Sequence, residues 1–500
     1  GKQRPMMASS RSLLAHIDLA LLTDYYQLTM MGGYLASGHA EQQAVFDLFY
    51  RRVPESGGFC VAAGLERALE YIDSLRFTPD DIQYLRSLSA FDDVFLDYLQ
   101  EFRFRGDVHA LEEGTIVFPG EPIMRVSGAM PEAQLLESAL LNIVNFQTLI
   151  ATKAARVCHA AGDEGHVLEF GLRRAQGVDG AISASRAAYI GGCEATSNVL
   201  AGRMFGIPVR GTQAHSWIMS FESELEAFRA YARAYPHDTA LLVDTYDTLA
   251  SGVPNAITVA REMAAQGLRL SSIRIDSGDL AFLSKEARRM LDEADLSQVR
   301  IVASSDLDEH IIHDLKAQGA RIDVWGVGTR LVTSYSAPAL GGVYKLVAAT
   351  DAGGRMLPRV KVSSNPEKTT TPGVKQVWRT YDSHGLFAGD IVALDDEDLR
   401  DGRSAIRTRH PTYLYARRSV PRVSGIEPLL VPVITNGRRV YDPPPLTEVR
   451  KRALTQLRLL RQEHKRFINA DIYWVGLSER LFEMRARLIE EASPEPAGGG

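Results

Sequence analysis

The chain has 500 residues, of which 45% are apolar and 24% are charged, and its formal net charge is −6. This composition is typical of a soluble globular protein of two or three domains. The acidic balance argues against a nucleic-acid partner, whose binding face is usually basic. Three widely spaced cysteines form neither a disulfide framework nor a zinc signature, which predicts a reducing, cytoplasmic location. No uninterrupted run of 18 apolar residues occurs, so we expect no membrane span.

The first third of the chain mixes helix and strand patterns. An apolar stretch at 44–55 predicts a strand, residues 64–77 predict a helix, and residues 114–128 predict short antiparallel strands broken by glycine and proline. A long helix is predicted over 135–162. We therefore expect residues 11–140 to form a first segment of mixed α and β structure.

Residues 141–345 alternate short apolar strands with helices. The predicted strands are 166–171, 206–212, 240–247, 271–279, 299–306 and 322–329. Each is followed by a polar turn and then a helix, which is typical of successive βα units and a parallel sheet. We interpret this segment as a full or truncated (β/α) barrel, because no glycine-rich dinucleotide fingerprint opens the series. An open flavodoxin-like sheet is the alternative.

The pattern changes again after residue 345. Residues 341–349, 359–379 and 412–420 predict antiparallel strands, and we expect the segment 346–440 to return to the sheet of the first third. The C-terminal segment, 441–490, is predicted to be helical, with an amphipathic helix beginning at Leu446.

Reactive side chains follow the six predicted parallel strands. In barrels of βα units the loops after the strands form the active site. Taken singly, each residue is explained by a turn or a helix N-cap. Together they would gather arginines, carboxylates and one histidine at one edge of the sheet, and we therefore predict one active site there. The main residues are Arg173, Arg174, Thr212, His215, Asp244, Arg274, Asp276, Asp279, Ser304, Asp306, Gly328 and Thr329.

These side chains also narrow the substrate. The turn 326–329 offers backbone N–H groups and a hydroxyl at a helix start, which predicts a phosphate cradle, and Arg173 can add bidentate contacts to phosphate. Asp276 and Asp279 suit sugar hydroxyls or a magnesium ion between phosphates. Arg274 shares a strand face with Asp276 and can hold a carboxylate. The residues thus point to a phosphorylated sugar and a small acid.

Eight motifs, in order between Leu21 and Arg379, resemble those of nicotinate phosphoribosyltransferases. The motifs are LLTDYYQLTM, EFGLRRAQG, GTQAHSW, LLVDTYDTL, IRIDSGDL, GVGTRLVT, LGGVYKLV and EKTTTPGVKQVWR. The resemblance implies transfer of phosphoribosyl from phosphoribosyl pyrophosphate to nicotinate in NAD salvage, coupled to ATP hydrolysis with Mg²⁺. It also implies a truncated α/β barrel packed on an α/β sandwich built from both ends of the chain, and a homodimer.

The resemblance further implies roles for individual residues. His215 would be transiently phosphorylated by ATP. With the residue arguments above, we assign His215, Arg274, Asp276 and Asp279 to the catalytic set. The substrates would be held by Tyr26, Thr212 and Arg274 for nicotinate, and by Arg173, Gly328 and Thr329 for phosphoribosyl pyrophosphate. No metal ligands are implied.

Two enzymatic alternatives remain open at this point, besides a non-enzymatic binding protein that keeps the fold as a nucleotide sensor. The first is a phosphoribosyltransferase for nicotinamide. We expect Arg274 to favour the acid, because a buried guanidinium opposite a neutral amide would lack a counter-charge. The second is a phosphosugar-binding barrel enzyme of other chemistry. An aldolase or isomerase would need a strand-end lysine or catalytic carboxylate, and none of the six predicted strand ends carries a lysine.

Overall fold

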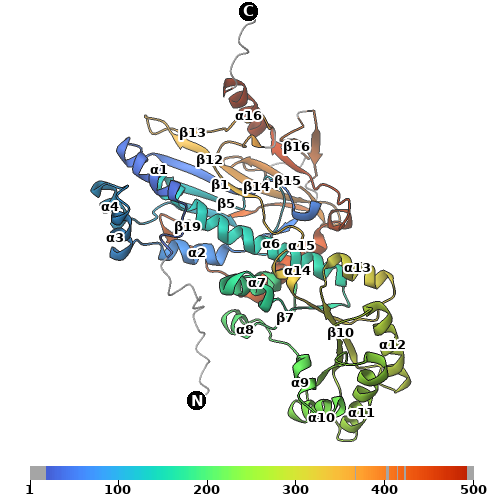
Figure 1. Ribbon diagram of the computed structural model, residues 1–500. Helices are drawn as coiled ribbons and strands as arrows, with labels where there is room; N and C mark the ends of the chain where they lie inside the picture. Colours follow the sequence, from blue (N-terminus) through green and yellow to red (C-terminus); the bar gives the residue numbers. More distant parts are fainter. Residues whose placement is uncertain (1–18, 366–367, 401–404, 414, 422–423, 493–500) are drawn as a thin grey trace, which may run out of the picture. The chain divides into compact units, whose positions relative to one another are not determined.

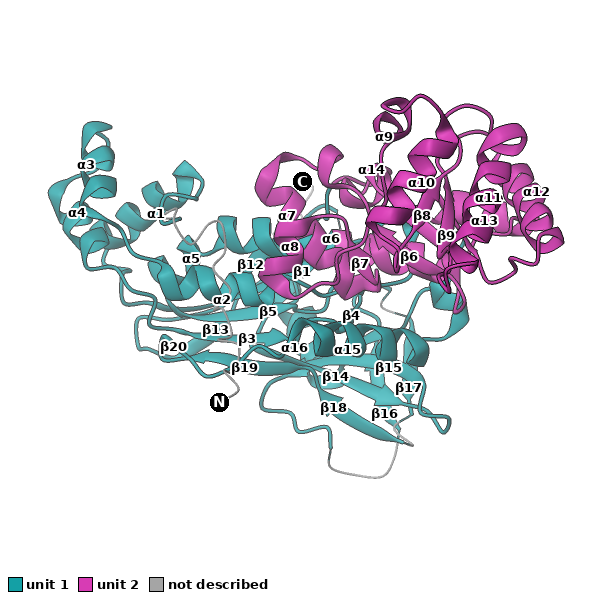
Figure 2. Cartoon of the chain, turned by 90° about the horizontal axis from the view of Figure 1, so that it is seen from below, with its two compact units in different colours: residues 1–149, 339–500 teal, residues 150–338 magenta. Residues whose placement is uncertain are grey.

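The computed structural model divides into two compact units (Figures 1 and 2). Residues up to 149 and from 339 onward form the first unit, and residues 150–338 form the second. The first unit is thus assembled from both ends of the chain. The predicted segment start at residue 11 lies outside the described residues, which are 19–365, 368–400, 405–413, 415–421 and 424–492.

A seven-stranded antiparallel sheet forms the centre of the first unit (Figure 1). The strand order is β13-β12-β1-β5-β3-β19-β20, so strands from the two ends of the chain lie side by side. The central strand β1 is buried on both faces, as its nearly continuous apolar run predicts. The bounds are β1 (Gln43–Tyr50), β3 (Asp107–Leu111), β5 (Met124–Ala129), β12 (Gly342–Thr350), β13 (Met356–Pro358), β19 (Leu430–Thr435) and β20 (Arg438–Arg439).

A second, six-stranded sheet in the first unit has the order β17-β16-β21-β15-β14-β18. Its strands are β14 (Lys375–Tyr381), β15 (Phe387–Leu394), β16 (Ile406–Arg409), β17 (Arg417–Val420), β18 (Gly425–Pro428) and β21 (Val475–Ser478); β2 (Cys60–Val61) and β4 (Ile116–Val117) pair separately. The strand predicted over 359–379 begins only at Lys375. Pro372 lacks an N–H group and Gly373 has a φ of 90°, so the backbone cannot continue the ladder there.

The helices of the first unit cover its sheets. They are α1 (Tyr25–Ala36), α2 (Leu65–Ser74), α3 (Pro79–Ser87), α4 (Asp93–Gln100), α5 (Met130–Leu135), α15 (Leu446–Leu459), α16 (Glu479–Ala492) and the part of α6 (Glu137–Ala161) up to residue 149. Leu69 of α2 and Leu140 of α6 are fully buried in the same core as Leu48 of β1. The helical run 130–161 is long and apolar enough to cross a membrane by length and composition alone. However, 61% of its most apolar window is buried, as in the core helix of a globular protein.

The second unit is built on a six-stranded sheet with the order β7-β6-β11-β10-β9-β8, and every neighbouring pair is parallel. This confirms the predicted series of βα units. The strands are β6 (His166–Glu169), β7 (Ala195–Thr196), β8 (Ala240–Leu242), β9 (Ser272–Ile275), β10 (Arg300–Ser305) and β11 (Val324–Val327). The helices are α7 (Gly177–Gly191), α8 (Val199–Phe205), α9 (His215–Met219), α10 (Glu224–Ala234), α11 (Val253–Ala264), α12 (Leu280–Glu293), α13 (Glu309–Ala317) and α14 (Thr329–Val332).

The prediction of a strand over 206–212 is wrong in extent. Only Val209 forms a bridge, to Thr196 of β7. Pro208 has no N–H to donate to a ladder, although its carbonyl accepts from the Thr196 N–H at 3.0 Å. The short strand β7 was not predicted, because two residues carry no periodic signal.

Candidate active site

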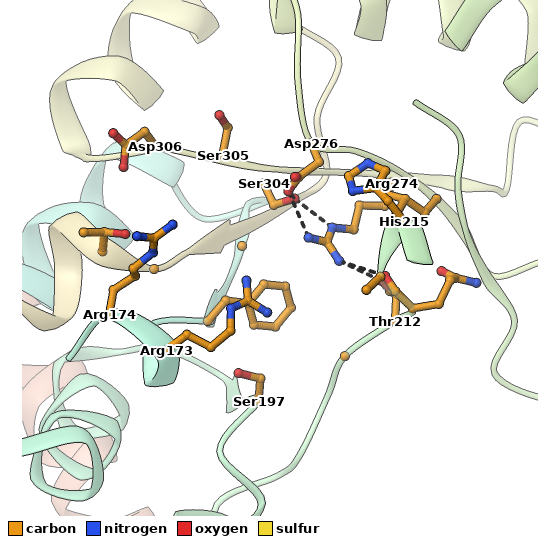
Figure 3. A pocket seen from close by; sticks show the side chains of 18 residues that line it. Arg173, Arg174, Ser197, Thr212, His215, Arg274, Asp276, Ser304, Ser305 and Asp306 are labelled. Atoms are coloured by element: carbon orange, nitrogen blue, oxygen red, sulfur yellow. Dashed lines mark hydrogen bonds and ion pairs between the residues drawn. The ribbon is translucent and has the colours of Figure 1, made fainter. Parts of the chain in front are cut away.

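A cavity of about 510 Å³ opens at the carboxyl ends of the parallel strands in the second unit (Figure 3). The residues after β6, β9, β10 and β11 and the segment 211–215 line it. Because all these strands are parallel, their reactive ends meet at one edge of the sheet. The lining includes Phe170, Arg173, Arg174, Ser197, Thr212, His215, Arg274, Asp276, Ser304, Ser305, Asp306, Gly328 and Thr329.

Arg274 is the centre of a hydrogen-bond network in this cavity (Figure 3). Its Nη1 donates to Thr212 Oγ1 and its Nη2 to Asp276 Oδ1, both at 2.9 Å, while its Nε donates to Ser304 Oγ at 2.7 Å. The Ser304 hydroxyl in turn donates to Asp276. The Gln213 carbonyl also accepts from Nη1, at 3.5 Å. Four partners thus fix the plane of the guanidinium, and one N–H group on Nη2 stays available because a guanidinium has five donors.

The ion pair between Arg274 and Asp276 changes one argument from the sequence. The Arg274 side chain is 16% exposed and that of Asp276 is 32% exposed. Asp276 supplies the counter-charge that we expected to be missing opposite a neutral amide. The charge of Arg274 therefore does not by itself separate nicotinate from nicotinamide, and the orientation of its free N–H group carries more of the distinction.

Phe170 was not predicted as a site residue, although it lines the cavity. Its ring centre lies 5.8 Å from Cζ of Arg274. A Cβ atom at Gly326 would approach the ring to 2.6 Å, so the absence of a side chain at Gly326 leaves room for the ring. The cavity thus offers an aromatic face beside a cation, an arrangement that suits a planar aromatic anion.

His215 stands at the first position of α9 and is oriented by Asp244. Its Nε2 lies 3.0 Å from Asp244 Oδ1, and the Asp244 side chain is 1% exposed. The other carboxylate oxygen accepts from the Asp276 N–H at 3.0 Å and from Ser277 Oγ at 2.5 Å. A carboxylate at Nε2 places the proton there, so Nδ1 carries the lone pair. The sequence places Asp244 among the predicted site residues but does not reveal this role, because the contact spans 29 residues.

The predicted phosphate cradle lies where β11 ends. Gly328 and Thr329 line the cavity at the start of α14. The next residue, Arg330, donates to Asp308 at 2.7 Å, and this hydrogen bond raises the pKa of Arg330. Asp308 is buried and also caps α13, so it ties the cradle to the neighbouring βα unit. In the view of Figure 3, Arg173 and Arg174 lie on the opposite side of the cavity from His215.

The structure brings most of the predicted site residues together. The cavity lining contains Arg173, Thr212, His215, Arg274, Asp276, Gly328 and Thr329. Asp279 is not part of the lining: it caps α12, where its carboxylate accepts from the Phe282 N–H at 3.0 Å. Tyr26 lies on α1 of the first unit, with 49% of its surface exposed, whereas the lining comes entirely from the second unit.

Arginines, carboxylates and hydroxyls at the carboxyl edge of parallel βα units define an α/β enzyme that handles a phosphorylated substrate. Comparison with known proteins narrows this class: the chain belongs to the nicotinate phosphoribosyltransferase family. The N-terminal domain model of the family matches residues 21–145, the family model matches 166–382, and the C-terminal domain model matches 374–485.

Relatives resemble the chain over nearly its full length. The nicotinate phosphoribosyltransferase of Bacillus subtilis is 47% identical over 487 residues, which cover 96% of this chain and 98% of the relative. The human nicotinate phosphoribosyltransferase is 36% identical, with 95% and 97% covered. The crystal structure of human nicotinic acid phosphoribosyltransferase has a TM-score of 0.81 at 34% identity, and the match covers 93% of this chain and 99% of that one.

Proposed function

We propose that the protein transfers phosphoribosyl from phosphoribosyl pyrophosphate to nicotinate, giving nicotinate mononucleotide and pyrophosphate for NAD biosynthesis. Family membership and the names of the relatives support this function. The observation that carries it within the structure is the oriented guanidinium of Arg274 beside the ring of Phe170. Together they suit the carboxylate and the pyridine ring of nicotinate.

The transfer itself requires positioning rather than covalent help. The pyridine nitrogen attacks C1 of the ribose while the bond from C1 to the pyrophosphate oxygen breaks. The attacking nitrogen carries no proton, so no general base is needed. Correct placement of the two substrates can supply about 7–11 kcal/mol of the barrier. Arg173 and Arg174 face the cavity and stabilise the charge that develops on the leaving pyrophosphate.

We propose that ATP drives the reaction through a phosphohistidine at His215. The lone pair of Nδ1 attacks the γ-phosphorus of ATP, the bond to the β-phosphate oxygen breaks, and ADP leaves. Asp244 stabilises the imidazolium character that develops, since it accepts the Nε2 proton. Thr212, which accepts a hydrogen bond from Arg274, is in the same short segment as His215. Phosphorylation of His215 would therefore take place close in sequence to a residue that contacts nicotinate.

The donor set of the cavity fits Mg²⁺. Asp276 and Asp306 contribute carboxylate oxygens to the lining, and the Asp306 side chain is 69% exposed. Carboxylate oxygens are the protein ligands that Mg²⁺ uses together with substrate phosphates. When bound there, the ion would neutralise charge on the pyrophosphate. Asp279 suits this role less well, because its carboxylate caps α12.

We also propose that the parallel sheet is the wall of a truncated barrel. Its order, extended by the Val209 bridge, is Val209, β7, β6, β11, β10, β9 and β8. The last strand of the chain series, β11, therefore pairs with the first, β6, which is the cyclic order of a barrel with one open seam. The seam falls between Val209 and β8, where Gln213 Nε2 donates to the Ala240 carbonyl at 3.0 Å.

The assembly that we propose is a cytoplasmic homodimer without nucleic-acid or membrane partners, in which Tyr26 reaches the cavity of the second copy. The net charge of −6 supports the absence of a nucleic-acid partner. Leu22, Tyr25 and Tyr26 expose apolar surface at the start of α1, which supports a protein contact there. A monomer in sedimentation equilibrium would contradict this proposal.

Product formation tests the function. The protein is incubated with phosphoribosyl pyrophosphate, Mg²⁺ and nicotinate, with and without ATP, and nicotinate mononucleotide is identified by mass. We expect turnover that ATP stimulates, and loss of the stimulation in His215→Asn. Absence of nicotinate mononucleotide under all conditions would contradict the proposed function.

A further inference from the structure

Glu169 is a fully buried carboxylate directly beneath the cavity wall. It is the last residue of β6 and is 1% exposed. Its Oε1 accepts from the Gly171 N–H, and its Oε2 accepts from Ser185 Oγ at 2.8 Å and Thr196 Oγ1 at 2.5 Å. These donors are one backbone amide and two hydroxyls. A buried carboxylate is costly unless hydrogen bonds compensate it, so these three bonds are strongly favoured.

The three donors belong to three different elements. Gly171 precedes the turn that carries Arg173 and Arg174, Ser185 lies on α7, and Thr196 lies on β7. One carboxylate thus sets the distance between the strand end, the turn and the helix behind it. Such a shared acceptor restrains a loop more strongly than pairwise contacts, because each bond fixes the geometry of the others.

A second layer of bonds extends the restraint to Ser197, which also lines the cavity. The Ser197 N–H donates to the Glu169 carbonyl at 3.0 Å. The following residue, Asn198, donates through its N–H to Thr196 Oγ1 at 3.0 Å and through Nδ2 to Ser185 Oγ at 3.3 Å. The hydroxyls that bind Glu169 are therefore themselves held in place. The hydrogen-bonded cluster around Glu169 thus adjoins four residues that line the cavity, namely Phe170, Arg173, Arg174 and Ser197.

We propose that Glu169 is a positioning residue that holds the arginine turn and the Ser197 wall in the geometry that phosphoribosyl pyrophosphate and nicotinate require. This inference rests on the proposed function and deepens it. Glu169 touches no substrate and acts through Gly171, Ser185 and Thr196. Displacing a positioned group by about 1 Å can cost on the order of 100-fold in rate, so a loosened turn affects substrate binding before it affects folding.

The test compares Glu169→Gln and Thr196→Val with a matched control. The glutamine keeps the size of the side chain and one acceptor for Gly171, while its NH₂ group forces both hydroxyls to reorient. Thr239→Val is the control, because Thr239 is equally buried but donates to the Tyr235 carbonyl at 2.6 Å, outside this cluster. We expect KM for phosphoribosyl pyrophosphate to rise about tenfold in Glu169→Gln, less in Thr196→Val, and not at all in the control.

Hydrogen exchange supplies a readout that does not depend on turnover. In the unliganded full chain we expect amides in 170–175 to exchange about tenfold faster in Glu169→Gln, with no change around residue 239. A purely structural role would lower the folded fraction and hence the apparent kcat, and would leave KM unchanged. Unchanged KM, or unchanged exchange at 170–175, would overturn the proposal. If the unmodified protein shows no turnover, the proposed function fails, and the exchange rates alone decide the role of Glu169.

Discussion

Two arginine–carboxylate pairs, one in each unit, show how burial separates a structural ion pair from a functional one. In the first unit, Arg379 and Asp390 are both fully buried, and their side chains lie as close as 2.5 Å. Arg379 also donates to the Ile116 carbonyl and to Gln456, and Tyr473 donates to Asp390 at 2.9 Å. Protein groups thus enclose this pair on every side.

The pair of Arg274 and Asp276 in the second unit has the same chemistry but faces a cavity. Its guanidinium is oriented by Thr212, Gln213 and Ser304 and keeps one N–H group on Nη2 for a ligand. The fully buried pair of Arg379 and Asp390, called the sealed pair below, stabilises the folded state. The pair of Arg274 and Asp276, called the open pair, faces a cavity and can also bind an anion. The predictions below separate these two roles.

The largest effect is expected at the sealed pair. Arg379→Met leaves Asp390 buried without its cation, which costs about 3–5 kcal/mol in the free energy of unfolding. Chemical denaturation measures this loss. In the protein that remains folded, KM for nicotinate is expected to match that of the unmodified chain. A small stability change with a large rise in KM would show that the two pairs do not differ as described.

The open pair should behave in the opposite way. Arg274→Lys keeps the charge but loses the planar fork that contacts Thr212, Ser304 and Asp276. We expect kcat/KM for nicotinate to fall by about 100-fold, equivalent to about 2.7 kcal/mol, with little change in melting temperature. If the melting temperature fell and the kinetics did not change, Arg274 would be a structural residue.

A smaller loss is expected at Asp244. Asp244→Asn replaces the acceptor at His215 Nε2 with an amide, so the imidazole loses the partner that fixes its tautomer. We expect ATP stimulation to fall about tenfold, while turnover without ATP stays unchanged. The control is Asp247→Asn, at a carboxylate that caps the next helical turn and does not line the cavity. Equal losses in the two variants would refute the role of Asp244.

Ser305 stores strain at the edge of the cavity. Its φ is 143°, a region that side-chain-bearing residues rarely adopt, and it lines the cavity. Ser305→Gly should raise the free energy of unfolding by about 1 kcal/mol. Ser305→Ala keeps the Cβ atom and should give no gain. Thermal unfolding of the two variants side by side checks this, and an equal response would argue against strain.

The smallest expected effect is on how stability changes with pH, and it involves Glu121, which interacts with Asp390 of the sealed pair. Burial, followed by the nearby Asp390 carboxylate, holds the pKa of Glu121 well above its usual 4.5. The folded protein therefore keeps a proton that the unfolded chain releases, and the contribution of Glu121 to stability falls as pH rises above 4.5. Glu121→Gln should lose less stability than the unmodified protein between about pH 5 and about pH 8. If the free energy of unfolding of the variant and of the unmodified protein changed equally with pH, the raised pKa assigned to Glu121 would be contradicted.

The sequence predicted the parts of the site that depend on single strands. Asp276 follows β9 and Thr329 follows β11, and parallel strands place their ends at one edge. Asp279 resembled a site residue because a carboxylate before a helix gives the same local pattern whether it binds substrate or caps the helix. The role of Asp244 depends on a contact with a residue 29 positions away, and no local pattern encodes such a contact.

The sequence likewise predicts the local parts of the fold but not its long-range strand pairings. Strand and helix alternation gave the parallel sheet, since each βα unit has its own periodicity. The pairing of β1 with β12 joins segments about 300 residues apart, and hydrophobic periodicity does not specify partners at that distance. Likewise, the room that Gly326 leaves for Phe170 is a packing relation between β11 and the residue after β6, which appears only once the register of the two strands is known.

The most direct test of the central claim is the ratio of kcat/KM for nicotinate to that for nicotinamide, measured in one preparation with phosphoribosyl pyrophosphate and ATP. We predict a ratio of at least about 100, because the guanidinium of Arg274, with its free N–H group on Nη2, recognises a carboxylate. We further predict that Arg274→Lys reduces the ratio. A ratio near or below one would contradict the assignment of the open pair to the acid.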